Sequence, residues 1–252
     1  MKVIINADDC GMSELANQHI EAAINAGKIT STTVMANMHD LQGARRLYET
    51  YKNEISFGIH LNLTQGSPIL YSQPLLDCGF YKMENDILQF SGRGFEKRFL
   101  TSVCREEIYK ELVAQAQVLR DNNITISHID SHHHIHTSFF MVMVLPAFSK
   151  KIKVYKIRNV RNFMPFSIRK IERNVWSAMQ KLQNVHLRMT DYMCSYAEFN
   201  DYYKQVKPST SSVIELMCHP GHAKYEEEEK LLMFQDIKQF CPCELINYNN
   251  LK

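Results

Sequence analysis

The sequence predicts an α/β fold, and more specifically one (β/α) barrel with about seven or eight strands. Short segments rich in β-branched residues alternate with segments of helical period along the whole chain, which is typical of a parallel sheet or barrel. The length of 252 residues is common for a single barrel. Since no linker-like or low-complexity stretch divides the chain, we expect one domain over residues 1–252.

Eight segments have the length and composition of strands. They are residues 3–6, 30–36, 55–63, 124–129, 153–158, 187–189, 213–218 and 244–247. A helix follows the first strand, with Ser13 as its N-cap and Gly27 as its C-terminal stop. Further helices are predicted at 41–51, 106–121 and, despite Pro146, 139–149. The run Glu226–Glu229 is expected to be the solvated start of another helix, where carboxylates suit the helix dipole.

The connection after the third predicted strand is unusually long. Residues 65–100 contain several Gly, Pro and Ser residues and show no clean period. A long irregular connection in a compact domain is commonly a lid or a binding loop, so we expect a long loop with that role. The alternative is a disordered insertion.

The composition excludes several classes of partner. Lys and Arg number 29 against 27 Asp and Glu, and the charges are scattered, so neither nucleic acid nor a membrane surface is expected as a partner. The first apolar stretch ends at Asn6, too early for a signal peptide, and no later run reaches membrane-spanning length. The seven cysteines include no Cys-x-x-Cys spacing, as in a cytosolic protein with reduced thiols. We therefore expect a cytoplasmic protein, and the sequence is compatible with a homodimer.

Acids and imidazoles follow several of the predicted strands. Asp8 and Asp9 come after the first strand, His60 lies near the end of the third, and His219 follows the seventh. Residues 128–136, after the fourth strand, hold five of the eleven histidines. Because the carboxyl ends of parallel strands meet at one mouth of a barrel, we expect these side chains to converge there.

Each of these features also has an ordinary structural explanation. The Asp pair could cap the next helix, and His60 could be a core histidine. The histidine cluster is harder to explain by packing, because imidazoles have no advantage over aliphatic residues at a strand end. Two imidazoles and one carboxylate with an open position are a common catalytic zinc site. We therefore expect a metal site, with Asp8 and Asp9 dividing the roles of ligand and base and His219 as the acid.

No rival motif of equal strength is present. The chain has no Gly-x-Ser-x-Gly elbow, no phosphate-cradling loop after the first strand and no dinucleotide-binding fingerprint. A thiol nucleophile at Cys218 is disfavoured, because Cys218 and His219 are neighbours at a strand end and would point to opposite faces. Metal-dependent hydrolysis is the chemistry that these residues favour.

Five ordered segments resemble the YdjC-like carbohydrate deacetylases, which include chitooligosaccharide deacetylase. They are Asn-Ala-Asp-Asp-Cys-Gly at 6–11, Gly-Lys-Ile-Thr-Ser-Thr-Thr at 27–33, Gly-Ile-His-Leu-Asn-Leu-Thr-Gln-Gly-Ser-Pro at 58–68, the histidine-rich residues 128–136, and Glu-Leu-Met-Cys-His-Pro-Gly at 215–221. The resemblance implies a barrel related to polysaccharide deacetylases. It also implies a small carbohydrate substrate, from which N-acetyl groups of an amino sugar or short chitooligosaccharide are removed with release of acetate.

Position by position, the resemblance implies that Asp9, His60 and His132 hold one divalent metal ion and that Asp8 is the base. Zinc suits this ligand set, and magnesium and other divalent ions remain open.

The resemblance places two further residues near the reaction. It implies that Arg158 orients the base and contributes to the substrate site, and that His134 supports the metal site or touches sugar hydroxyls.

Two alternatives remain open. The same residues could activate water in a metal-dependent phosphatase or esterase, which product analysis would reveal. The protein could also be a non-catalytic sugar- or metal-binding protein, although pure binding needs no base at Asp8.

Overall fold

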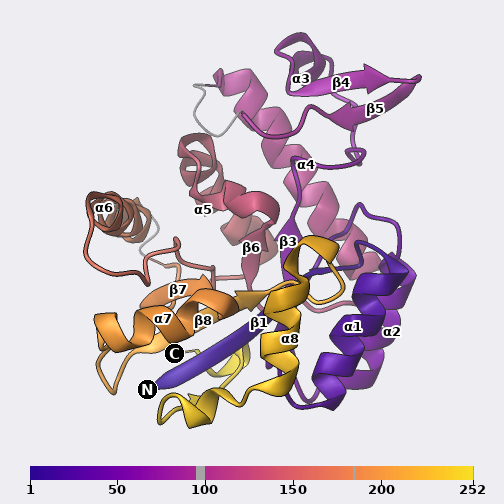
Figure 1. The fold of residues 1–252 in the computed structure, drawn as a ribbon. Coiled ribbons are helices and arrows are strands. Elements are labelled where there is room, and N and C mark those ends of the chain that lie inside the picture. The colour runs from indigo at the N-terminus through magenta and orange to yellow at the C-terminus, as the bar shows by residue number, and fades with distance from the viewer. Residues whose placement is uncertain (95–99, 184–185, 252) are drawn as a thin grey trace.

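The computed structural model describes residues 1–94, 100–183 and 186–251. Its main element is a parallel seven-stranded sheet of order β6-β3-β2-β1-β8-β7, with β9 pairing with the start of β1 (Figure 1). The strands are β1 (Lys2–Cys10), β2 (Ser31–Val34), β3 (Ser56–Leu61), β6 (Ile129–Ser131), β7 (Tyr192–Ser195), β8 (Val213–Cys218) and β9 (Glu244–Leu245).

The sheet curls until its two edge strands are linked. Isolated bridges join Ile129 of β6 to Ile157, and Lys156 to Arg188, which lies shortly before β7. The α/β barrel prediction is confirmed, but the strands predicted at 153–158 and 187–189 are reduced to these bridges.

Side chains pair with the backbone directly after the bridging segments. Asn159 donates to the carbonyl of Thr190 at 2.8 Å, and Asn162 accepts from the backbone N–H of Met193 at 3.0 Å. These bonds satisfy backbone groups that a regular ladder would otherwise pair. The predicted strand 124–129 was also placed too early, since β6 begins at Ile129, and β7 was not predicted.

Helices surround the sheet (Figure 1). They are α1 (Glu14–Asn25), α2 (Leu41–Tyr51), α4 (Ser102–Asp121), α5 (Phe139–Ile152), α6 (Ile168–Gln183), α7 (Tyr196–Val206) and α8 (Glu226–Phe234), with 3₁₀ turns η1 (His132–Thr137), η2 (Ala223–Tyr225), η3 (Ile237–Gln239) and η4 (Tyr248–Asn250). Ser13 caps α1 as predicted, accepting the N–H of Ala16 at 3.1 Å. None of the helices that the structure describes combines the length and apolar character needed to cross a bilayer.

The segment 65–100 is not irregular throughout. It contains α3 (Gln73–Asp77) and an antiparallel hairpin of β4 (Tyr81–Glu84) and β5 (Ile87–Phe90), while residues 95–99 lie outside the described part. The two-residue turn, Asn85 and Asp86, has φ of 51° and 61°, as type I′ hairpin turns require. Buried Phe80 packs on Phe90 and on Phe140 of α5, so an aromatic cluster holds the insert to the barrel.

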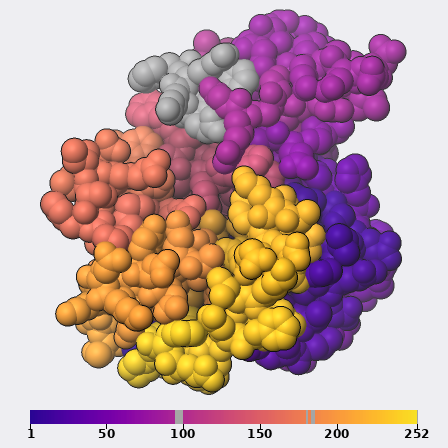
Figure 2. Space-filling view, in the orientation of Figure 1, coloured from indigo at the N-terminus to yellow at the C-terminus, as the bar shows by residue number. Residues whose placement is uncertain are grey.

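The C-terminal part of the chain lies against its beginning. Figure 2 shows the residues around α8 in contact with α1 on the surface. The contact is close because Gly221 has no side chain: a Cβ there would lie 3.0 Å from the Cα of Ala16. The loop after β8 is thus held beside the first turns of α1.

Candidate metal centre

A bulge in β1 brings two neighbouring carboxylates into the barrel. Between Ala7 and Cys10 the pairing with β2 shifts register by one residue, and Asp9 has φ of 66°. In a regular strand Asp8 and Asp9 would point to opposite faces, whereas a bulge re-aims its side chains. Both residues are consequently buried, and both reach groups inside the barrel.

Asp9 lies between two imidazoles. Its Oδ1 is 3.2 Å from His60 Nε2 and 3.0 Å from His132 Nδ1. One ligand atom from each of the three buried residues lies within 4.8 Å of the others. The structure therefore brings together the three residues that the sequence suggested as metal ligands.

The orientation of His60 fits a metal ligand. Its Nδ1 donates to Asp130 Oδ1 at 2.6 Å, and Thr33 donates to the other oxygen of Asp130 at 2.9 Å. A carboxylate behind a histidine fixes its ring and directs the second nitrogen to the metal. Burial alone would lower the pKa of His60, but the charge and hydrogen bond of Asp130 outweigh it and raise this pKa to about 10. The carboxylates around His60 therefore favour a positive charge at this place.

His132 owes its position to a sharp turn. It directly follows β6, and the next two residues, His133 and His134, have φ of 55° and 56°. The Nε2 atom of His132 lies 3.0 Å from Oε1 of Gln65, the first residue of the long connection. That connection therefore begins in contact with the candidate metal centre.

Arg158 occupies the bottom of the centre and is completely buried. Its Nη1 and Nη2 each donate to one oxygen of Asp8 at 2.6 Å. Nη2 also lies 2.8 Å from Asp130, and Nε donates to Glu215 at 2.7 Å. Burial raises the pKa of Asp8, but the charge and hydrogen bonds of Arg158 outweigh it and hold this pKa well below the usual range. Asp8 is thus an ionised acceptor in a fixed orientation.

The contacts of Arg158 also bear on a second possible metal site and on the role of Arg158 itself. Asp8, His60 and Asp130 also lie close enough to share an ion, but both carboxylates of that group already form ion pairs with Arg158. Every nitrogen of the guanidinium faces a buried carboxylate, which favours the orienting role of Arg158. Its contact with substrate stays a prediction.

His219 follows β8 and approaches Asp8 from the side. Its Nε2 lies 3.9 Å from Asp8 Oδ2, its Nδ1 lies 3.1 Å from Glu228 Oε2, and its ring stacks on Tyr225 at 4.2 Å between centroids. Burial opposes protonation of His219, but the hydrogen bond to Glu228 and nearby carboxylates outweigh it and raise its pKa. Glu228 is only 5% exposed, so the prediction that the glutamate run is simply solvated is wrong at this position.

The other histidines of the cluster have different surroundings. His134 is half-buried, with its ring 6.1 Å from that of His136. Burial and the charge of Arg158 hold the pKa of His134 well below its usual value, so its ring is neutral. A neutral imidazole can exchange hydrogen bonds with sugar hydroxyls, and this role stays a prediction. His128 is fully buried and stacks on Tyr248.

Sequence reasoning did not assign roles to Asp130, Glu215 or Glu228. Glu215 stands in the apolar segment 213–218. Because a charged residue in a buried strand must be paired, the sequence could have predicted an interior partner for Glu215. Asp130 stood within the histidine-rich segment, so its proximity to metal ligands was also readable. Nothing in the sequence distinguished Glu228 from its three glutamate neighbours.

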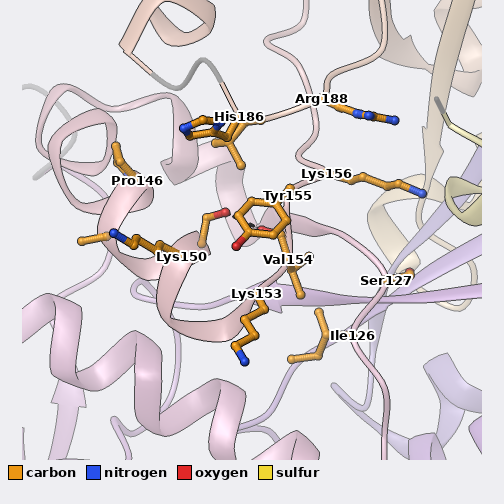
Figure 3. Close-up of a pocket in the computed structure, with 13 residues that line it drawn as sticks. Ile126, Ser127, Pro146, Lys150, Lys153, Val154, Tyr155, Lys156, His186 and Arg188 are labelled. Atoms are coloured by element: carbon orange, nitrogen blue, oxygen red, sulfur yellow. Dashed lines mark hydrogen bonds between the residues drawn. The ribbon is translucent and has the colours of Figure 1, made fainter.

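A large cleft lies elsewhere. A cavity of about 890 Å³ is lined by the C-terminal half of α5, residues 153–156 and residues 186–188 (Figure 3). Lys156 and Arg188 extend side by side from its wall. Ile126 and Ser127, which precede β6, also line it, so the cavity lies at the amino-terminal end of that strand, opposite the carboxyl ends of the strands. None of the predicted site residues lines this cavity, so its size does not locate the chemistry.

Comparisons with known proteins agree with the fold and the motifs. The sequence model of the family described as YdjC-like protein matches residues 2–243. A carbohydrate deacetylase of Halalkalibacterium halodurans is 30% identical over 226 residues, covering 88% of this chain and 86% of that protein. One from Vibrio cholerae is 30% identical over 250 residues, covering 91% and 86%. These matches confirm the resemblance seen in the sequence.

A solved structure supports the fold. The crystal structure of a putative cellobiose-phosphate cleavage protein from Enterococcus faecalis superposes with a TM-score of 0.78 over 99% of this chain and 98% of that one, at 24% identity. The two chains therefore share their architecture.

Proposed function

The chain belongs to the family of YdjC-like proteins, and from this premise we propose that it is a metal-dependent carbohydrate deacetylase. Its substrate is an amino sugar or short chitooligosaccharide, which loses an N-acetyl group as acetate. The observation that carries the proposal is the placement of Asp8 and His219, 3.9 Å apart, beside the buried group of Asp9, His60 and His132. Relatives that match most of the chain are named carbohydrate deacetylases.

The proposed metal site consists of Asp9, His60 and His132, which would hold one divalent ion. One carboxylate and two imidazoles suit zinc, whereas magnesium prefers a set of oxygen ligands. When bound, such an ion polarises a carbonyl and lowers the pKa of water. The contact of His60 with Asp130 keeps the ring directed at Asp9.

Asp8 and His219 would move the protons. Asp8 is ionised and held by Arg158, so one of its oxygens can accept the proton of the attacking water. His219 is protonated more readily than a free imidazole and donates from Nε2 to the departing amine, while Glu228 holds its Nδ1. The lowered pKa of Asp8 and the raised pKa of His219 favour an ionised carboxylate beside a protonated imidazole, which are the starting states of a base and an acid.

Substrate selection is proposed to involve His134, Arg158 and the connection that begins at Gln65. A pocket of about 590 Å³ near the end of the bridging segment is lined by three arginines, Arg161, Arg169 and Arg173, and one carboxylate, Glu198. This excess of positive charge favours a sugar that carries an acidic group such as phosphate.

Acetate release tests the proposal. The protein is stripped with a chelator, reconstituted with zinc or magnesium, and incubated with neutral and phosphorylated N-acetylated sugars. Acetate release that depends on added metal is expected, and phosphate release alone would favour a phosphatase instead. Binding of sugar or metal without turnover under every metal would leave a non-catalytic binding protein and end the deacetylase assignment.

A further inference from the structure

The last 3₁₀ turn, η4, places a tyrosine inside the barrel. Tyr248 is fully buried, and its backbone N–H donates to Ser56 Oγ at 3.0 Å. From the outside, Lys156 Nζ donates to the carbonyls of Tyr248 and Asn249 at 2.6 and 3.0 Å. Lys156 belongs to the wall of the large cleft (Figure 3). The turn is thus held from both sides at the end of the barrel opposite the catalytic mouth.

One chain of contacts leads from the Tyr248 hydroxyl to Asp8. The hydroxyl donates to Glu215 Oε2, and the other oxygen of Glu215 accepts from Arg158 Nε at 2.7 Å. The two Nη atoms of Arg158 then hold Asp8. Burial raises the pKa of Tyr248 well above its usual value, so its hydroxyl remains a donor.

A second chain leads from the ring of Tyr248 to the same carboxylate. The ring stacks on His128 with centroids 3.6 Å apart and an angle of 8°. His128 Nε2 lies 3.3 Å from Asn6 Oδ1, and Asn6 Nδ2 donates to Asp8 Oδ1 at 2.8 Å. Space for this stack depends on Gly58, because a Cβ there would lie 2.5 to 2.7 Å from atoms of the His128 ring.

We propose that Tyr248 and Glu215 are positioning residues that orient the carboxylate of Asp8 through Arg158 and Asn6. The inference rests on the proposed function, in which Asp8 is the base. Neither residue reaches the reaction itself: Glu215 pairs with Ile4 of β1, four residues before Asp8, or about 13 Å along the strand. Their effect is to fix the guanidinium plane, since Glu215 holds Nε while Asp8 and Asp130 compete for the Nη atoms.

The test compares Tyr248→Phe with a matched tyrosine elsewhere. Tyr248→Phe keeps the stacked ring and removes only the hydroxyl. Tyr51, on α2, is also buried, with its hydroxyl on Glu21 and Asn25, so Tyr51→Phe is the control. We expect Tyr248→Phe to lower kcat by about 3- to 30-fold, the worth of one buried hydrogen bond, with KM and metal content unchanged. Tyr51→Phe should leave kcat unchanged.

A readout without catalysis separates this inference from the proposed function. The side-chain Nε–H resonance of Arg158, protected by Glu215, should shift or lose protection from exchange in Tyr248→Phe and not in Tyr51→Phe. If the wild-type protein releases no acetate, the proposed function fails. The Arg158 resonance still shows in that case whether Tyr248 positions Arg158. An unchanged kcat together with an unchanged Arg158 resonance in Tyr248→Phe would overturn the inference.

A second variant covers the case in which Tyr248→Phe does not fold. Lys156→Met loosens η4 from the cleft side and leaves the barrel interior intact. It should perturb the Arg158 resonance in the same direction and by a smaller amount. Hydrogen exchange shows whether η4 has loosened in the folded Lys156→Met protein. If η4 has loosened and the Arg158 resonance is unchanged, the result counts against the proposal.

Discussion

Adjacent residues Asp8 and Asp9 are expected to fail in different ways when each is changed to Asn. Asp8→Asn removes the charge that Arg158 holds through two bonds of 2.6 Å, and an amide cannot accept a proton from water. Turnover should fall by about 10² to 10⁴-fold, or about 2.7 to 5.4 kcal/mol of activation free energy. The protein should still fold, because Arg158 keeps Asp130 and Glu215 as partners.

Asp9→Asn should act on the metal instead. Asp9 Oδ1 faces both His60 and His132, and an amide oxygen is a poorer ligand than a carboxylate. Metal content after dialysis, measured by elemental analysis, should therefore fall in Asp9→Asn and stay near that of the wild type in Asp8→Asn. Acetate release is measured in parallel at saturating metal.

The two measurements together can refute the reasoning. Loss of metal in Asp8→Asn, with ion and activity retained in Asp9→Asn, would reverse the two roles. Unchanged turnover in both variants would remove the hydrolase assignment itself. Thermal unfolding of each variant shows whether a loss of activity reflects loss of folded protein.

Three further predictions concern the acid, the core and the insert. Glu228→Gln removes the carboxylate that raises the pKa of His219, so His219 should lose its proton at a lower pH. The basic limb of the plot of kcat against pH should therefore move to lower pH. A basic limb that does not move would contradict the role of His219 as the acid. Gly58→Ala should lower the free energy of unfolding in urea by about 1 to 3 kcal/mol, because the new methyl group would meet the His128 ring, and an unchanged midpoint would contradict this. Replacing residues 81–90 with a short Gly-Ser link should change KM differently for different sugars, and equal constants for all sugars would exclude a role in selection.

The sequence alone determined the fold class and where along the chain the chemistry lies. Strand and helix periods report local burial, and the carboxyl ends of parallel strands must share one mouth, so the acids and imidazoles that follow the strands could be grouped before their distances were known. The family resemblance then selected Asp9, His60 and His132 from this group, and the structure brings these three together. The resemblance to a family rests on the same local segments, and the match over residues 2–243 confirms it.

Only the tertiary structure decided how these groups are oriented. The bulge that turns both Asp8 and Asp9 inward depends on pairing between β1 and β2, which local sequence does not encode. Sequence reasoning assigned no role to Glu228 or Tyr248, and only the family resemblance suggested that Arg158 orients the base. Arg158 and Tyr248 contact residues far away in the chain: 150 residues separate Arg158 from Asp8, and 192 separate Tyr248 from Ser56. A buried charge must be paired wherever the fold places it, so these partners could be identified only once the fold had closed.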